Sequence, residues 1–328
     1  MQKSVVVNGL GRIGRGIVRE ILKKENFRLI ALNDIYDIDH LVYLLKYDSV
    51  HKSSLTVYKK DNETIFINGK EVKYYSSKDL SFLKNIKANL LIECSGVYDK
   101  ASYFYPFLDK NIDRVLFAFV IKDNTPMFVF EVNHQNYLGE KILSAASCTS
   151  TCVTPILKIL NDFISIKRVF ATTIHSYNAD QNLLDSKTDS LDFRKARSST
   201  LNLLPISSGI AYATSRILPF LKGKILGCSV RVPVCDVTAI DLSLEFEKSV
   251  DKFNLIEYLK KQTKNSKRIL LLNTPFVSSD IISSPYSSII DLSSIEIIDN
   301  FLKIFIWQDN EIGYINALLD TASFILEK

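Results

Sequence analysis

Cys148, in the segment Ser147-Cys148-Thr149, is the first candidate for covalent chemistry. An apolar helical pattern follows it, so the thiol is expected near a helix N-terminus. The positive end of a helix dipole lowers a thiol pKa and favours the nucleophilic thiolate. Cys152 lies one helical turn further in, and a cysteine taken singly is more often an inert core residue. The pattern therefore favours Cys148 without excluding a structural role.

A cysteine nucleophile needs a base, and His175 is the best placed of the four histidines. It ends the apolar run 171–175, where a strand gives way to a polar stretch, whereas His40, His51 and His134 lack this setting. An imidazole at a strand end near the thiol would complete a thiolate–imidazole pair. The alternative is a histidine that only makes hydrogen bonds within its loop.

A glycine motif near the N-terminus, Gly9-x-Gly11-x-x-Gly14, indicates dinucleotide binding. It lies between an apolar run at 4–8 and an amphipathic helical pattern, the setting in which such glycines bring backbone close to a pyrophosphate. Asp34 follows about 20 residues later, where an acid holds the adenosine ribose and repels a 2′-phosphate. This favours NAD over NADP, although a strand-ending aspartate also commonly caps the next segment.

The elements that must position these residues read as two domains of an α/β protein. Apolar runs at 4–8, 27–32, 89–94 and 114–119 predict a doubly wound parallel sheet in a dinucleotide-binding domain. Alternating strands at 226–232 and 238–246 predict an α+β catalytic domain with a largely antiparallel sheet. The polar stretch 178–205 between them is expected to be a long, irregular and functional loop.

Composition excludes several classes of protein. The chain has 328 residues and a net charge of +5 spread along its length, which argues against nucleic-acid binding. Five cysteines without zinc-ribbon spacing argue against a disulfide framework or a metal site. Without a leader pattern or an apolar run of about 18–20 residues, the chain is expected to be soluble and cytoplasmic and not to bind membranes.

Ordered motifs along the whole chain resemble the phosphorylating glyceraldehyde-3-phosphate dehydrogenase family. They are Asn8-Gly9-Leu10-Gly11-Arg12-Ile13-Gly14-Arg15, Tyr47-Asp48-Ser49-Val50-His51, Ala146-Ser147-Cys148-Thr149, His175-Ser176-Tyr177 and Trp307-Gln308-Asp309-Asn310-Glu311-Ile312-Gly313-Tyr314. The resemblance implies a cofactor domain at 1–147, a catalytic domain at 148–312, and a C-terminal helix at about 313–328 that packs back on the first domain. It also implies a homotetramer.

The resemblance assigns roles residue by residue. Cys148 would be the nucleophile, and His175 its base and later its acid. The residues implied to bind NAD are Gly9, Gly11, Arg12, Ile13, Gly14, Asp34, Lys78, Asn310 and Tyr314, with Asn310 orienting the carboxamide. The residues implied to bind the aldehyde phosphate or inorganic phosphate are Ser147, Thr149, Asn178, Asp180, Lys195, Ser208, Gly209 and Arg231. No metal is implied.

Departures from the family pattern keep two alternatives open. Thr151 replaces an asparagine, Asn178 a threonine, and Lys195 an arginine whose planar fork suits phosphate better than an ammonium does. Ser186-Lys187 stands where NAD-specific enzymes have Leu-Pro, so NADP is not excluded. The main interpretation is oxidation and phosphorylation of glyceraldehyde 3-phosphate to 1,3-bisphosphoglycerate. The alternatives are an erythrose-4-phosphate dehydrogenase that hydrolyses its thioester, and a catalytically weak paralogue with a binding role.

Overall fold

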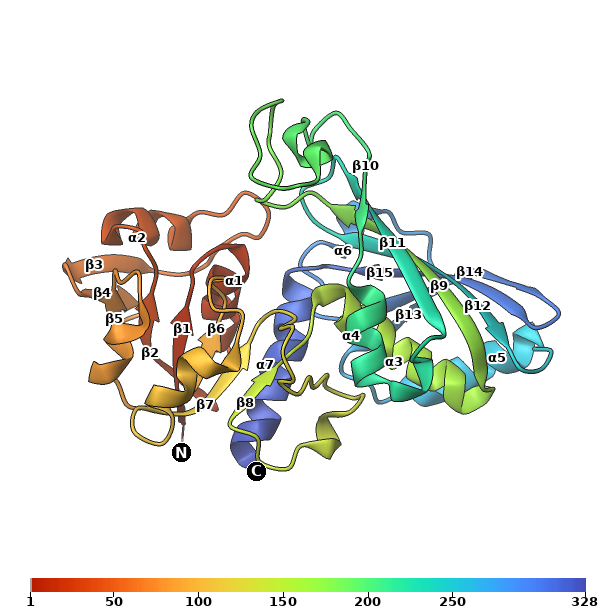
Figure 1. Cartoon of the computed structure of the whole chain (residues 1–328), viewed down its shortest axis with the longest axis horizontal. Helices are drawn as coiled ribbons and strands as arrows, with labels where there is room; N and C mark the ends of the chain where they lie inside the picture. The colour runs from red at the N-terminus through yellow and green to blue at the C-terminus, as the bar shows by residue number, and fades with distance from the viewer. Residues whose placement is uncertain (1) are drawn as a thin grey trace. The chain divides into compact units, whose positions relative to one another are not determined.

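A computed structural model describes residues 2–328, which fold into two units. The first unit contains Met1–Ser147 and Ile315–Lys328, and the second contains Cys148–Tyr314. Each unit is built on one large sheet whose strands are labelled in Figure 1. The prediction of an α/β fold with two different sheets is confirmed.

The sheet of the first unit has the order β3-β4-β5-β2-β1-β6-β7-β8. Its strands are β1 (Lys3–Asn8), β2 (Phe27–Asn33), β3 (Val57–Asp61), β4 (Thr64–Ile67), β5 (Lys70–Tyr75), β6 (Ala88–Glu93), β7 (Ile112–Phe117) and β8 (Ile142–Ser144). All neighbours are parallel except the pairs that β4 makes with β3 and β5. The strand order reverses at β1, and a crevice at such a point is the usual ligand site of an open α/β sheet.

Three longer helices belong wholly or partly to this unit: α1 (Arg12–Ile21), α2 (Ile38–Lys46) and most of α7 (Ile312–Glu327). Asp37 caps α2 by accepting a hydrogen bond from the backbone N–H of His40. A Cβ on Gly16 of α1 would collide with the Ile315 side chain, so the start of the C-terminal segment packs closely against α1. Lys24 and Asp320 form an ion pair at 3.1 Å between the end of α1 and α7.

The sheet of the second unit is mixed, with the order β10-β11-β9-β12-β15-β14-β13. Its strands are β9 (Ile166–Ser176), β10 (Leu204–Ser207), β11 (Ile225–Val232), β12 (Thr238–Phe246), β13 (Ile269–Leu272), β14 (Ser288–Ile298) and β15 (Phe301–Gln308). Strand β9 separates the two strands predicted from their alternation, running parallel to β11 and antiparallel to β12. The sheet is therefore largely, but not wholly, antiparallel.

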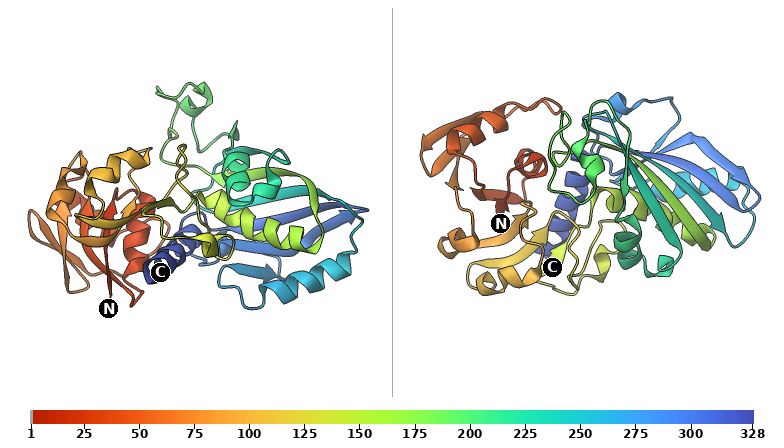
Figure 2. Two further views of the ribbon diagram at one scale, coloured as in Figure 1. Left: turned by 60° about the horizontal axis from the view of Figure 1, so that its bottom comes forward. Right: turned by 45° about the horizontal axis from the view of Figure 1, so that its top comes forward.

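Helices α3 (Cys148–Phe163), α4 (Ile210–Ile217) and α5 (Lys252–Thr263) cover one face of this sheet (Figure 2), and α6 (Ser278–Ile281) is a single turn. Alternation along β9 shows which face is covered: Ala171, Thr173 and His175 are buried, whereas Phe170 is exposed. The segment before β10 is irregular, as predicted, apart from a short 3₁₀ helix at Phe193–Ala196.

Candidate active site

Cys148 is the first residue of α3, which confirms the predicted helix N-terminus. Its Sγ lies 3.7 Å from Nε2 of His175 and 4.0 Å from Oγ1 of Thr149. Cys152 lies one turn further along and is fully buried. The structure therefore brings His175 next to Cys148, and this geometry favours Cys148 over Cys152 as the nucleophile.

His175 stands at the end of β9 with its ring held in one orientation. Its Nδ1 lies 2.8 Å from the carbonyl oxygen of Ser176. Because a carbonyl can only accept, Nδ1 carries the proton in the neutral ring, and Nε2 presents a lone pair. That lone pair faces the Cys148 thiol, which is the arrangement of a general base beside its nucleophile.

Burial opposes separate charges on this pair. It raises the pKa of the Cys148 thiol, while the Thr149 hydroxyl and the Arg231 guanidinium act in the opposite direction. Burial and then Arg231 lower the pKa of His175 to about 4. The lowered thiol pKa expected from the helix dipole alone is therefore wrong, because desolvation outweighs it. A proton moved from Sγ to Nε2 creates both charges together, so each stabilises the other.

Arg231 supplies positive charge beside the pair. It lies directly opposite His175 in the register of β11 and β9, and its NH1 donates to the Ser176 carbonyl at 3.0 Å. With its amide oriented to satisfy both neighbours, Asn178 accepts a hydrogen bond from Arg231 NH2 at 3.0 Å. The buried Nε of Arg231 has no hydrogen-bond partner among residues 2–328. A half-buried guanidinium whose buried Nε is unsatisfied suits an anionic ligand.

The remaining predicted phosphate ligands fall into two groups. Lys195 Nζ lies 2.6 Å from Asp180 Oδ2, so these two side chains pair with each other. Ser208 and Gly209 immediately precede α4, and Thr149 is the second residue of α3, which packs against α4. Free backbone N–H groups at helix N-termini attract anions, which supports the prediction for this second group.

Asn310 is held by two hydroxyl groups of the same unit. Its Oδ1 accepts from Ser176 Oγ at 3.1 Å and from Thr238 Oγ1 at 3.0 Å. These bonds fix the amide orientation and leave Nδ2 as the donor. Tyr314, also assigned to the cofactor, is 2% exposed at the start of α7, and its role stays a prediction.

A cavity of about 260 Å³ in the first unit lies at the carboxyl ends of its central strands. Four predicted cofactor residues line it, namely Gly9, Gly11, Asp34 and Lys78. Gly9 has φ of +88°, which favours glycine, and a Cβ on Gly14 would collide with the Gly9 carbonyl. The cradle therefore fits the close backbone approach that a dinucleotide requires. Arg12 and Ile13, the other residues predicted there, form the first turn of α1.

Asp34 lines the cavity and also makes local hydrogen bonds, whereas the cap of α2 is Asp37. The Asp34 carboxylate accepts hydrogen bonds from the backbone N–H groups of Leu10 and Ile35. It therefore ties the glycine turn to the end of β2 while also lining the cavity. An additional anion at a ribose 2′ position would meet this carboxylate.

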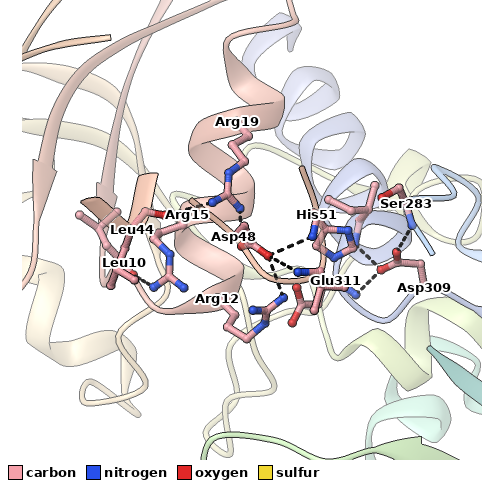
Figure 3. Close-up of polar contacts among 12 residues, drawn as sticks. Leu10, Arg12, Arg15, Arg19, Leu44, Asp48, His51, Ser283, Asp309 and Glu311 are labelled. Carbon is pink, nitrogen blue, oxygen red and sulfur yellow. Dashed lines mark hydrogen bonds and ion pairs between the residues drawn. The ribbon is translucent and has the colours of Figure 1, made fainter. Parts of the chain in front are cut away.

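Asp48 orders the arginines of α1 (Figure 3). Its carboxylate lies 2.9 Å from Arg19 NH1 and 3.6 Å from Arg12 NH2, and it accepts the backbone N–H groups of Val50 and His51. Burial acts to raise the pKa of Asp48, but these N–H groups and the two guanidiniums hold it far below its usual range. The carboxylate thus stays ionised and fixes one side of Arg12.

Several residues line the cavity without having been predicted as cofactor ligands: Asn8, Asn33, Ser77, Cys94, Ser95, Val97 and Tyr98. A usable signal was the polar residue that ends each buried strand, because Asn8, Asn33 and Glu93 close β1, β2 and β6. In the second unit, Gln308 pairs with Thr238 and is fully buried with no partner for its amide in the described chain. The local sequence does not predict this, because a glutamine at the end of an amphipathic strand is usually exposed.

The dinucleotide cradle and the cysteine–histidine pair together define a dehydrogenase that works through a thiol nucleophile. Family models agree: residues 3–101 match the glyceraldehyde 3-phosphate dehydrogenase NAD binding domain, and residues 147–310 match its C-terminal domain. The chain belongs to the glyceraldehyde 3-phosphate dehydrogenase family. It is an oxidoreductase, and its cofactor is NAD.

Curated relatives cover the whole chain. Glyceraldehyde-3-phosphate dehydrogenase B of Aspergillus oryzae is 35% identical over 99% of this chain and 98% of its own length. Glyceraldehyde-3-phosphate dehydrogenase of Priestia megaterium is 35% identical over 100% and 99%, and that of Buchnera aphidicola 33% over 100% of each. Within residues 2–328, no helix combines the length and apolarity needed to cross a membrane.

Proposed function

We propose that this chain oxidises and phosphorylates glyceraldehyde 3-phosphate to 1,3-bisphosphoglycerate with NAD. The observation that carries the proposal is the 3.7 Å approach of the His175 Nε2 lone pair to Cys148 Sγ. This pair can form a thioester from an aldehyde, and a thioester conserves the energy needed to bind phosphate to the acyl group.

The residues act in a fixed sequence. Cys148 Sγ adds to the aldehyde carbon, and its proton passes by way of His175 Nε2 to the carbonyl oxygen, giving a hemithioacetal. Nε2 then takes the hydroxyl proton as the carbon loses hydride, which leaves a thioester on Sγ. NAD, when bound, supplies the hydride acceptor. A phosphate oxygen finally attacks the thioester carbonyl and breaks the carbon–sulfur bond. Sulfur leaves as the thiolate and takes up the proton held by Nε2, and the proton of the attacking phosphate passes to solvent, which restores the thiol and the neutral imidazole.

Two groups of donors are proposed to hold the phosphates. The donors Arg231, Asn178 and Lys195 form one group, in which Asp180 accepts a hydrogen bond from Lys195, and the buried unsatisfied Nε of Arg231 supports it. Ser147, Thr149, Ser208 and Gly209 form the other group. Their positions at the starts of α3 and α4, two helices that pack against each other, support it. Asn178 replaces the family threonine with another hydrogen-bonding side chain, so a donor is retained at this position.

NAD is proposed to bind through Gly9, Gly11, Arg12, Ile13, Gly14, Asp34 and Lys78, with Asn310 donating from Nδ2 to the carboxamide and Tyr314 nearby. The Asp34 carboxylate, which lines the cavity, supports preference for NAD over NADP. Kinetics with both dinucleotides measure this preference directly.

We further propose a dinucleotide-binding domain at 1–147 with the C-terminal helix, a catalytic domain at 148–312, a homotetramer and a cytoplasmic location. Large exposed apolar side chains in the irregular segment of the second unit support assembly: Leu183, Leu184, Leu191, Phe193, Leu201 and Leu203. Such a surface is typical of one that a further subunit covers. Light scattering after size-exclusion chromatography gives the subunit number.

The decisive test is the initial rate of NADH formation with glyceraldehyde 3-phosphate and with erythrose 4-phosphate, each with and without inorganic phosphate. The proposal expects fast, phosphate-dependent turnover with the triose. Faster, phosphate-independent turnover of erythrose 4-phosphate would instead identify a hydrolytic enzyme. Retained NAD binding without turnover of either aldehyde would indicate a binding protein.

A further inference from the structure

A chain of buried polar side chains runs behind the dinucleotide cavity, across the ends of three neighbouring strands. Asn33, at the end of β2, donates from Nδ2 to Asn8 Oδ1 at 2.7 Å. Asn8, at the end of β1, donates from Nδ2 to Glu93 Oε2 at 2.5 Å. Glu93, the last residue of β6, is 0% exposed. Asn8 and Asn33 line the cavity, and Glu93 lies behind them.

Both ends of this chain are fixed by backbone donors. At one end, the Ser77 N–H donates to Asn33 Oδ1 at 3.0 Å. At the other, the Ser95 N–H donates to Glu93 Oε1 at 2.7 Å, and the Ser95 hydroxyl donates to the same oxygen. A backbone N–H can only donate, so the atoms of residues 33 and 93 that face these two N–H groups must be acceptors.

These fixed ends determine what residue 93 must be. Each asparagine accepts through its Oδ1 and donates through its Nδ2. An asparagine that accepts from one neighbour in the chain therefore donates to the next one. Two donors entering from opposite ends must meet at a group that accepts on both sides. Of the three side chains only the Glu93 carboxylate can do so, because an amide there would place N–H against N–H somewhere along the chain.

We propose that Glu93 is a positioning residue for NAD: as the double acceptor, it holds Asn8 and Ser95 where they form the wall of the cofactor cavity. The proposal rests on the cofactor site proposed above. Backbone hydrogen bonds also connect these residues to the glycine cradle. The Gly9 N–H donates to the Asn33 carbonyl at 2.9 Å, and the Cys94 N–H donates to the Asn8 carbonyl at 2.7 Å. A Cβ on Gly9 would collide with Ser95 backbone, so a displaced Ser95 moves the cradle as well.

Burial raises the pKa of Glu93 to about 7, although its bonds from Ser95 and Asn8 act to lower it. Its direct neighbours on β1 and β7 are Asn8 and Phe117, which do not titrate. Burial, and then the charge of Glu93, raise the pKa values of Cys94 and Tyr98 above their ordinary, already alkaline values. Asp34 and Lys78 line the same cavity.

The test uses direct NAD binding by calorimetry, which does not depend on aldehyde turnover. Glu93→Gln is expected to weaken NAD binding about tenfold or more, because an amide cannot accept at both ends. Asn8→Asp places a second carboxylate against Glu93 and should also weaken binding. The double variant Glu93→Gln with Asn8→Asp moves the double acceptor one link along the chain, satisfies every bond again and should restore most of the affinity.

The pH profile separates positioning from a simple packing role. In the parent, NAD affinity should fall as the pH drops from 8 to 6, because the protonated carboxyl loses one accepting site, and Glu93→Gln should lack this change. Thermal unfolding shows which variants fold. A folded Glu93→Gln protein with the parent's affinity and pH profile, or a double variant no better than either single one, would overturn the proposal. Absence of NAD binding in the parent would instead show that the proposed cofactor site is wrong, and failure of the proposed catalytic function would appear only as lost aldehyde turnover.

Discussion

Lys195 Nζ lies 2.6 Å from Asp180 Oδ2, and this ion pair balances the negative charge of a carboxylate that acts on Arg231. Without Lys195, the Asp180 charge would act unopposed on the guanidinium that is proposed to hold phosphate. Lys195 thus keeps the site electropositive even where it makes no direct phosphate contact.

Lys195→Ala should therefore raise the KM for the phosphorylated substrate or for inorganic phosphate by about tenfold, because charge-assisted contacts of this kind contribute about 1.5–3 kcal/mol. Lys195→Arg should lower it, since the guanidinium can hold Asp180 and donate to phosphate at once. Steady-state kinetics measure both values, with Lys222→Ala, at an exposed lysine of the same unit, as the control. KM values within twofold of the parent in both Lys195 variants would contradict this role.

Cys148→Ser should abolish NADH formation while NAD still binds, because a serine hydroxyl ionises far less readily than a thiol. Cys152→Ala is the matched control: this thiol is fully buried, and burial raises its pKa further. The control should keep most activity. Rates with glyceraldehyde 3-phosphate, together with NAD titrations, test both variants. Loss of activity in Cys152→Ala alone would mean that Cys152, and not Cys148, is the nucleophile.

His175 should make the catalytic unit sensitive to acid. Its pKa is about 4 in the folded chain and about 6.5 when exposed, so the unfolded chain takes up the proton first. The stability that the neutral imidazole contributes is present above pH 6.5 and is lost as the pH falls toward 4, by on the order of 3 kcal/mol. Urea unfolding followed by the fluorescence of Trp307, the single tryptophan, should show this loss in the parent.

The same measurement on His175→Gln should show a shallower pH dependence over that window, because glutamine does not titrate. His40→Gln, at an exposed histidine, serves as the control and should match the parent. Parallel curves for the parent and His175→Gln would mean that the imidazole is not held neutral.

Asp48→Asn should destabilise the first unit by about 3 kcal/mol, because it leaves the buried Arg19 without its carboxylate. The pKa of Asp48 is depressed, so its contribution is present above the usual carboxylate range and is lost only in strong acid. The loss should therefore be constant from pH 6 to 9 in thermal unfolding. Asp39→Asn removes an exposed pair with Lys59 and should change stability by less than about 1 kcal/mol.

Local sequence patterns predict much of this fold because periodicity and glycine chemistry act over short distances. The βαβ unit around Gly9 and Gly14, and the helix that starts at Cys148, lie where their patterns placed them. The position of β9 between β11 and β12 was not predictable in this way. Strand neighbours are chosen by tertiary packing, which a single strand's alternation does not encode.

The candidate site likewise has features that local sequence predicts and features that depend on the assembled fold. Residue type and local setting selected Cys148 and His175, but the pKa of Cys148 depends on burial, which only the assembled unit reveals. The pairing of Lys195 with Asp180 and the direction of hydrogen bonding through Asn8 to Glu93 also depend on long-range placement. Sequence patterns identify the chemical groups, whereas the fold determines their charge states and partners.

The closing segment Ile315–Lys328 belongs to the unit that the chain begins, and Ile315 packs where a side chain on Gly16 would stand. Without this segment the α1 surface around Gly16 is uncovered, so the first unit lacks its last layer, whereas all the residues of the second unit are present. A released chain truncated after Tyr314 should thus carry a protease-resistant second unit and a first unit that is open to cleavage.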